Sequence, residues 1–425
     1  MNIKKQKNPI GNYLFLIIVL FFSIILSGCQ LLPPFPQEEA KWTVMVYLAA
    51  GNDLETVGIQ DINEMELVGS TEEVNIVVQM DRIPFRTLSN YGMGIYDDFS
   101  NGNWTTTRRY YVTQDMNTNI IHSRLLIDLG EQNMGDVETL KDFAQWTIQR
   151  YPAERYMLVL WNHGGGFRSP GAGVSKDICW DYNFGLNSKI TMPQLEEALT
   201  FVQSLLGKKI DIIGMDACYM AMVEVAYQIK DCAQIMVASE ASIPPDGWQY
   251  DCILESLVAN PDQSSRQFAS EIVNCYDRQY SGSASGVTLS AVDLAGIDLL
   301  AGDISVLANQ IINDHTTPKN KYREARNITQ HYNSSQGLEY IDLKDFVIKL
   351  EDYTYSNQVL QTANQINQTL QSSRVIISNT YCGSSVKNSH GLSIYFPYYS
   401  YDNYYNYTNF SQDTSWDEML FHLGY

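Results

Sequence analysis

The sequence predicts an α/β protein, an α/β/α sandwich in which helices cover both faces of a mixed, mainly parallel sheet, with a helical C-terminal region. One observation is a set of apolar, β-branched runs, such as 42–50, 74–80 and 210–214, that suit fully buried strands. Another is that segments with helical spacing, such as 54–68 and 137–150, alternate with these runs. This alternation is typical of a largely parallel sheet buried on both faces.

The remaining elements follow from the same patterns. Strands are expected at 108–112, 156–161, 234–239, 286–292 and 391–396, and helices at 192–206, 219–229, 253–258, 265–280 and 294–312. Asp136 is a suitable N-cap for the helix at 137–150, and Thr191 followed by Pro193 suits the start of the helix at 192–206. The segment 316–379 has a polar, helical pattern without recognisable chemistry.

The balance of charged residues indicates which classes of molecule the protein is suited to bind. The 425 residues include 28 Lys and Arg against 48 Asp and Glu, a net charge of −20. Such a charge argues against nucleic acid as a partner, because phosphate binding needs basic surfaces. It favours electrostatic attraction of basic substrates.

The N-terminus has the features of an export signal. Three lysines within the first seven residues precede an apolar run at 13–26, which is short for a membrane span of ~20 residues. The run ends in Leu-Ser-Gly-Cys, which resembles a bacterial lipobox with Cys29 as the lipidated residue. We therefore expect a lipoprotein signal peptide at 1–28, a lipidated Cys and proline-rich tether at 29–40, and anchoring in a bacterial cell envelope. An ordinary secretory signal or an uncleaved anchor is the alternative.

Six cysteines remain, and their redox state is open. Export permits disulfides, but most of these residues lie in apolar segments, as buried free thiols do. None shows paired zinc-ligand spacing, and we nominate no metal ligand. The six are Cys179, Cys218, Cys232, Cys252, Cys275 and Cys382.

Two reactive side chains follow two predicted strands. His163, followed by three glycines, comes after the strand at 156–161, and Cys218 comes after the strand at 210–214. Neighbouring strands would deliver a thiol nucleophile and its base to one edge of the sheet. The expected helix at 219–229 would stabilise a thiolate at its N-terminus. The N–H groups of Gly164 and Cys218 would form an oxyanion hole. Either residue alone is more typical of a structural role.

Several blocks around these residues resemble the clostripain-like cysteine peptidases. They are WTVMVYLAAGNDLE at 42–55, LVLWNHGGG at 158–166, ICWD at 178–181, DIIGMDACYM at 211–220, SEASIPPDGWQYD at 239–251 and GLSIYFP at 391–397. The resemblance implies a caspase-like fold and a single peptidase domain over 41–425, with about 316–425 as its extension. It makes His163 the general base and Cys218 the nucleophile. The clan requires no third triad carboxylate, and we nominate none.

The resemblance also implies specificity for Arg or Lys before the cleaved bond. Asp216 would bind that side chain by a charge-assisted bond, although it would also suit a helix N-cap. Asp246 is a second candidate, although Asp-Gly is also turn chemistry. Several relatives cut themselves between the His and Cys blocks, which makes Lys176 the expected autocleavage site. Some relatives need Ca²⁺, and a calcium site here would have to be built from scattered acids and carbonyls.

The expected function is a lipid-anchored cysteine endopeptidase acting through a Cys–His dyad and a covalent acyl-enzyme. Its partners would be proteins or peptides with basic P1 residues and, through the lipid, a membrane. The first rival is a cell-surface binding lipoprotein that keeps the peptidase fold without turnover. A weaker rival is an acyl transferase that uses the same dyad.

Overall fold

The computed structural model describes residues 39–84, 99–167, 177–334, 337–371 and 373–425. The expected signal peptide, Cys29 and Lys176 lie outside these ranges. The residues from Ala40 to Tyr425 form one compact unit.

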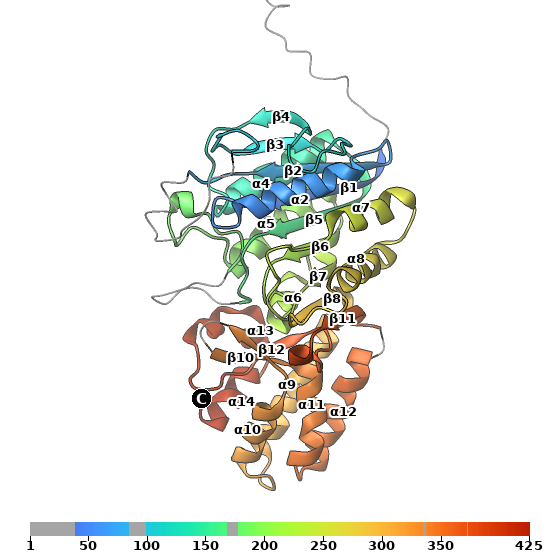
Figure 1. Ribbon diagram of the computed structural model, residues 1–425. Helices are drawn as coiled ribbons and strands as arrows, with labels where there is room; N and C mark the ends of the chain where they lie inside the picture. Colours follow the sequence, from blue (N-terminus) through green and yellow to red (C-terminus); the bar gives the residue numbers. More distant parts are fainter. Residues whose placement is uncertain (1–38, 85–98, 168–176, 335–336, 372) are drawn as a thin grey trace, which may run out of the picture. The chain divides into compact units, whose positions relative to one another are not determined.

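A nine-stranded mixed sheet forms the centre of this unit (Figure 1). Its five central strands run parallel in the order β7-β6-β5-β1-β2. Each outer strand pairs antiparallel with its inner neighbour: β8 with β7 and β11 with β8 on one side, and β3 with β2 and β4 with β3 on the other. The predicted mixed sheet with a parallel centre is confirmed. The strands are β1 (Ala40–Leu48), β2 (Val74–Met80), β3 (Arg108–Tyr111), β4 (Arg124–Asp128), β5 (Ala153–Trp161), β6 (Ile210–Asp216), β7 (Ala233–Ala238), β8 (Val287–Asp293) and β11 (Ile376–Cys382).

Helices cover both faces because neighbouring side chains of a strand point to opposite sides. Along β1, Met45 and Tyr47 join one buried cluster, which includes side chains of α4, α5, α6 and α9. Val44 and Val46 join a second cluster, which includes side chains of α2, α7 and α8. The helices are α2 (Glu55–Val68), α4 (Val137–Arg150), α5 (Met192–Leu206), α6 (Val223–Ile229), α7 (Tyr250–Ala259), α8 (Ser265–Tyr280) and α9 (Ile297–Asn313), with two short 3₁₀ turns, η1 (Tyr182–Phe184) and η2 (Leu294–Gly296).

Several helix boundaries agree with their sequence signals. Helices α4, α5 and α8 begin and end at the predicted residues. The Asp136 side chain accepts the backbone N–H of Glu138 at 3.0 Å, which satisfies one of the unpaired donors at the start of α4. The Thr191 N–H donates to the Gln194 side chain at 3.0 Å at the start of α5.

The C-terminal region is less uniformly helical than predicted. It contains α10 (Lys319–Ile328), α11 (Leu343–Tyr353), α12 (Asn357–Gln371), α13 (Asn409–Asp413) and α14 (Trp416–Leu423), together with η3 (Ser384–Val386) and η4 (Asn403–Tyr407). It also contains β11 and a separate three-stranded sheet of β9 (His331–Ser334), β10 (Gly337–Asp342) and β12 (Ser393–Tyr395). The purely helical prediction for 316–379 was wrong because β9 and β10 are short, and because β11 is a half-exposed edge strand without a clear apolar alternation.

Two further features bear on the class of protein. Cys252 of α7 and Cys275 of α8 form a disulfide, while Cys179, Cys218, Cys232 and Cys382 are free thiols. Within the described ranges, the segment Leu294–Asn313 is long and apolar enough to cross a membrane. Its apolar stripe is buried in the protein core as part of α9, so it is a core helix here.

Candidate active site

His163 and Cys218 meet at the carboxyl ends of two adjacent strands. Strands β5 and β6 pair in parallel, with Trp161 opposite Asp216. His163 and Cys218 each lie two residues beyond this pair, so the register brings them to the same edge of the sheet. A pocket of about 150 Å³ opens between them, and its lining includes both side chains. The lining consists of Leu54, Trp161, Asn162, His163, Asp216, Ala217, Cys218, Ile243, Pro244, Pro245 and Gly247.

The imidazole of His163 has two fixed neighbours. Its Nε2 lies 2.8 Å from Oδ1 of Asp53, and both side chains are about one-third exposed. Burial would raise the pKa of Asp53, but the hydrogen bond and charge of His163 outweigh it and lower that pKa. The ring of Tyr182 stacks nearly parallel to the imidazole, with 6.5 Å between ring centres. Asp53 therefore stays ionised and orients the imidazole.

The loop that carries Asp53 is positioned by a clamp, in which two asparagine side chains bind the same two backbone carbonyl oxygens. The side-chain amides of Asn52 and Asn162 both donate to the carbonyl oxygens of Ala49 and Trp180. Asn162 immediately precedes His163, so the clamp ties the loop that carries Asp53 to the loop that carries His163. All four groups are buried, where hydrogen bonds are costly to leave unmade.

The environment of the Cys218 thiol differs from the prediction. Helix α6 begins only at Val223, five residues later, and has seven residues, so the proposed helix-terminus effect on Cys218 was wrong. The predicted helix began too early because the apolar residues that follow Cys218 pack as a loop. Instead, Cys218 Sγ accepts the backbone N–H of Ile243 at 3.2 Å, and the thiol in turn lies 3.7 Å from the Ile243 carbonyl oxygen, to which it donates.

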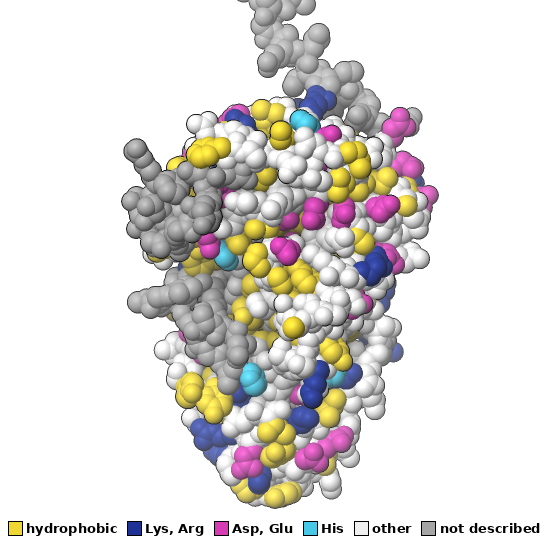
Figure 2. Space-filling view, viewed as in Figure 1, with side chains coloured by type: hydrophobic (Ala, Val, Ile, Leu, Met, Phe, Trp, Pro, Cys, Tyr) yellow, Lys and Arg dark blue, Asp and Glu magenta, His cyan; other side chains and the backbone are white. Residues whose placement is uncertain are grey.

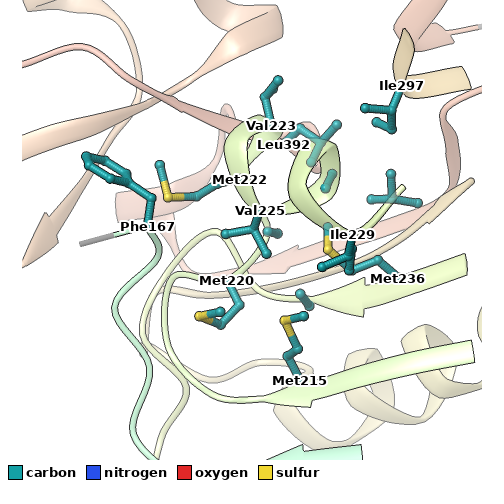
Figure 3. Close-up of a cluster of buried hydrophobic side chains, with 14 of the residues drawn as sticks. Phe167, Met215, Met220, Met222, Val223, Val225, Ile229, Met236, Ile297 and Leu392 are labelled. Carbon is teal, nitrogen blue, oxygen red and sulfur yellow. The ribbon is translucent and has the colours of Figure 1, made fainter. Parts of the chain in front are cut away.

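The loop after Cys218 is held on several sides. Tyr219 has a φ of 62°, an unusual value for a bulky residue, which turns the chain sharply after the nucleophile candidate. Met220 and Met222 are fully buried in an apolar cluster that also contains Phe167 (Figure 3). The Tyr340 hydroxyl of β10 donates to the Gly165 carbonyl oxygen at 2.7 Å. The C-terminal region thus contacts both site loops.

Gly164 lies against the backbone of Cys218. A side-chain carbon at Gly164 would come within 2.5 Å of the Cys218 carbonyl oxygen and 2.9 Å of its amide nitrogen. Only glycine fits this contact, because real side-chain carbons do not approach so closely. The two N–H groups predicted to form an oxyanion hole therefore belong to neighbouring stretches of backbone.

Asp216 lies in the wall of the pocket and is 4% exposed. Its Oδ2 accepts the Trp248 N–H and the Tyr250 hydroxyl, each at 3.1 Å. These partners come from the loop after β7 and from α7, so the alternative of a helix N-cap does not apply. Burial raises the pKa of Asp216 to about 7, with a further contribution from the charge of Glu64.

Two further acidic residues lie near Asp216, and no pattern in the sequence predicts a role for them in the site. Asp61 is buried and its Oδ2 accepts the Trp161 indole N–H at 2.6 Å, while Glu64 accepts the Tyr250 N–H at 3.1 Å. Burial, together with neighbouring negative charge, raises the pKa of Asp61 well above its usual range and that of Glu64 to about 7.

Asp246 is exposed, and it is not part of the pocket lining. Acidic side chains also form a row on the molecular face near α2 and α7 (Figure 2).

No carboxylate partner for His163 is predicted from the sequence, although Asp53 lies in the first of the quoted blocks. Its signal is position: Asp53 closely follows β1, the strand that pairs with β5 in parallel. Parallel strands end at the same edge of a sheet, so polar residues after β1 are candidates for the site. Asp61 and Glu64 lie within the following helix, where the sequence gives no comparable signal.

The fold and this site define an α/β protein with a His and a Cys at the ends of adjacent parallel strands, an arrangement that suits a base and a thiol nucleophile. The sequence model described as the clostripain family, Peptidase C11, matches residues 46–422. The chain therefore belongs to the clostripain family.

Particular relatives differ in how much of the chain they share. Clostripain of Hathewaya histolytica is 31% identical over 235 residues, which is 52% of this chain. The match covers 42% of that relative's own length.

Solved structures of C11 proteases share the fold. A secreted C11 cysteine protease from Bacteroides thetaiotaomicron, in complex with an irreversible peptide inhibitor, has a TM-score of 0.61 at 20% identity, over 90% of this chain and 99% of that one. An inactive zymogen C11 protease from Parabacteroides distasonis has a TM-score of 0.63 at 19% identity, over 91% of this chain and 99% of that one.

The contact between Asp53 and His163 gives the first testable prediction. Asp53→Asn should lower kcat/KM for peptide cleavage about tenfold to hundredfold, or ~1.4–2.7 kcal/mol, because the imidazole loses its orienting charge. The matched control is Asp115→Asn, which removes the carboxylate of the exposed pair formed with His122. Steady-state kinetics on both variants decides, and equal rates in wild type and Asp53→Asn would contradict the positioning role.

Proposed function

We propose that this protein is a cysteine endopeptidase that cleaves peptide bonds after Arg or Lys. The observation that carries the proposal is one pocket lined by His163, Cys218 and the buried acid Asp216. A base, a nucleophile and a carboxylate for a basic side chain are the three parts that this reaction needs.

Acylation begins with attack of the Cys218 sulfur on the scissile carbonyl carbon. The sulfur's proton passes to His163, and because Nε2 is bound to Asp53, Nδ1 is the atom that receives it. The ionised Asp53 stabilises the imidazolium that forms. The N–H groups of Gly164 and Cys218 stabilise the negative charge on the substrate oxygen.

Collapse of the tetrahedral intermediate breaks the C–N bond, and His163 gives its proton to the leaving amine. A thioester between Cys218 and the acyl half of the substrate remains. His163 then takes a proton from water, whose oxygen attacks the thioester, and the carboxylic acid product leaves with the thiol restored.

The preference for basic P1 side chains comes from Asp216. A guanidinium or ammonium in the pocket would pair with this buried carboxylate, whereas a neutral side chain would leave its charge uncompensated. Glu64 adds negative potential, because its charge raises the pKa of Asp216, whereas burial raises the pKa of Asp61 and favours its uncharged form. Asp246 stays a candidate for a weaker, exposed contribution to attraction of the basic group.

The proposal also includes self-cleavage of the enzyme during maturation and its anchoring in the cell envelope. Cleavage after Lys176 would open the chain between the His and Cys loops, and the same pocket would accept that lysine. Lipidation of Cys29 would hold the exported enzyme in the cell envelope. The C11 cysteine protease of B. thetaiotaomicron is a secreted protein, which supports export of this chain.

The dyad gives a direct prediction. Cys218→Ala and His163→Ala should each abolish cleavage of an Arg-P1 peptide, because neither half of the nucleophile–base pair works alone. Cys232→Ala is the matched control, since it removes another free thiol away from the pocket. Circular dichroism should show an unchanged fold in all three. Retained turnover in either dyad variant would overturn the proposal and favour the binding lipoprotein.

Specificity is tested by pH and by substrate charge. For an Arg-P1 peptide, kcat/KM should rise as pH passes about 7, because Asp216 must lose its proton to bind the cation. Asp216→Asn should lower kcat/KM on this substrate by about 2–4 kcal/mol, with Asp246→Asn costing less.

A peptide with citrulline at P1 is the matched substrate control, since it keeps the shape of Arg without its charge. Asp216→Asn should leave citrulline cleavage little changed. If Asp216→Asn lowered cleavage of the Arg and citrulline peptides equally, the carboxylate would not be the specificity determinant.

One mass measurement tests maturation and anchoring together. Protein from the native host should begin at a lipid-modified Cys29 and should be cut after Lys176. Cys29→Ser should lose the lipid mass, and Lys176→Ala should slow cleavage between the two site loops. A native chain that starts at unmodified Met1 would contradict the lipoprotein assignment, and cleavage unaffected by Lys176→Ala would contradict the processing site.

A further inference from the structure

The carboxylate of Asp216 is held from one side. Its Oδ2 accepts two hydrogen bonds, from the Trp248 N–H and from the Tyr250 hydroxyl, each at 3.1 Å. Among the described residues, no hydrogen bond reaches Oδ1 and the carboxylate forms no ion pair. Oδ1 is therefore the oxygen that remains for a further partner in the pocket.

The Tyr250 hydroxyl is a permanent donor to this carboxylate. Burial and the charge of Asp216 raise the pKa of Tyr250 well above its usual range, so the hydroxyl keeps its proton. A donated hydrogen bond favours the charged form of a carboxylic acid. Burial raises the pKa of Asp216, and the Trp248 N–H and the Tyr250 hydroxyl work against that rise. Of these two donors, the hydroxyl belongs to a side chain and can be removed by substitution.

Tyr250 is fixed in place from three sides. It is the first residue of α7, and its side chain is 3% exposed. Its backbone N–H donates to Glu64 Oε2 of α2 at 3.1 Å. Two residues later, the disulfide between Cys252 and Cys275 ties the start of α7 to α8. The hydroxyl is therefore held at Asp216 by α2 and α8 as well as by its own helix.

Glu64 acts on Asp216 in the opposite direction. Burial raises the pKa of Asp216, and the charge of Glu64 raises it further. Burial also raises the pKa of Glu64 to about 7, so the two acids titrate in the same pH range. Tyr250 joins them, because its N–H binds Glu64 and its hydroxyl binds Asp216.

The other titratable groups near Asp216 come from α2, α7, α8 and the pocket loops. Burial raises the pKa of Asp61 well above its usual range and favours its uncharged form. Burial likewise raises the pKa values of the tyrosines of α8, which therefore stay uncharged. Besides Glu64 and Tyr250, the groups around Asp216 are Asp61, Asp246, Asp251, Tyr276, Tyr280, His163 and Cys218.

We propose that Tyr250 is a positioning residue for substrate specificity, whose hydroxyl holds Asp216 in the charged form that a basic P1 side chain needs, against the opposing charge of Glu64. Tyr250 and Glu64 would together set the lowest pH at which the enzyme prefers Arg over an uncharged side chain of the same shape. Neither residue lines the pocket itself. This inference rests on the proposed function, because it concerns the pocket in which Asp216 would bind the substrate.

The ratio of kcat/KM for the Arg peptide to that for the citrulline peptide isolates this effect. Both peptides depend on His163 and Cys218 alike, so titration of the dyad cancels in the ratio, whereas the Arg peptide alone needs a charged Asp216. In the wild type, the ratio should rise with pH, with its midpoint at about 7.

Tyr250→Phe should move this midpoint up by about one pH unit, the rough effect of one donated hydrogen bond on a carboxylate. Well below the midpoint, the ratio should fall about tenfold, because one pKa unit corresponds to a factor of ten. Well above the midpoint, where Asp216 is charged in both proteins, the ratio should match that of the wild type.

Glu64→Gln should move the midpoint in the other direction, by about half a pH unit, because the amide still accepts the Tyr250 N–H but has no charge. A variant that merely loosened the pocket would not gain preference for Arg at low pH. Opposite shifts in the two variants therefore distinguish control of charge from a structural effect.

Tyr276→Phe and Glu255→Gln are the matched controls. Tyr276 is a buried tyrosine of α8 whose hydroxyl has no hydrogen-bond partner among the described residues. Glu255 is an exposed acid of α7, the helix that begins with Tyr250. Both variants should keep the wild-type midpoint.

The outcomes separate this inference from the proposed function. A wild-type ratio close to one at every pH would refute the preference for basic P1 side chains, and this inference with it. A wild-type midpoint that neither Tyr250→Phe nor Glu64→Gln moves, or that both move in the same direction, would overturn the inference and leave the proposed function standing.

A titration that needs no turnover checks the same point. Carbon NMR of the Cys218→Ala protein, labelled at its aspartate carboxyl groups and assigned with Asp216→Asn, follows the proton of Asp216 directly. Its pKa should rise when Tyr250→Phe is added and fall when Glu64→Gln is added. A pKa of Asp216 that is the same in all three proteins would overturn the inference.

Discussion

The parallel register of β5 and β6 is the constraint on which the site depends. With Trp161 opposite Asp216, His163 and Cys218 must emerge at equal distances beyond the same edge of the sheet. A slip of one residue would turn every side chain of the strand to the other face, and both faces are buried here. The nearly complete burial of these strands therefore fixes the geometry of the candidate dyad as well as the fold.

The loops beyond the strands are held by polar contacts, and two of the turns near the site have strained backbone. Asn52 and Asn162 bind the same two carbonyl oxygens, so hydrogen bonds join the Asp53 loop to the His163 loop. Positive φ values at Tyr219 and Cys179 place two sharp turns next to the site. Such strain persists only where the surroundings over-determine the backbone, as the buried methionines and the C-terminal sheet do here.

The sequence was informative where burial acts on continuous segments and silent where contacts join distant ones. The strands that carry His163 and Cys218 could be predicted because their apolar runs end at polar, reactive residues. The bond from Asp53 to His163 spans 110 positions, and no local pattern encodes it. The start of α6 was misjudged because buried residues after Cys218 mimic helical spacing while packing as a loop.

In the function that we propose, Cys218 is a nucleophile activated by His163 in a pocket for a basic side chain. The most direct measurement is peptide mapping after reaction with a peptidyl chloromethyl ketone that has Arg at P1. We expect one label per chain, on Cys218, at a rate that falls sharply in His163→Ala and with a norleucine analogue. Labelling of another cysteine, or equal labelling rates in wild type and His163→Ala, would contradict it.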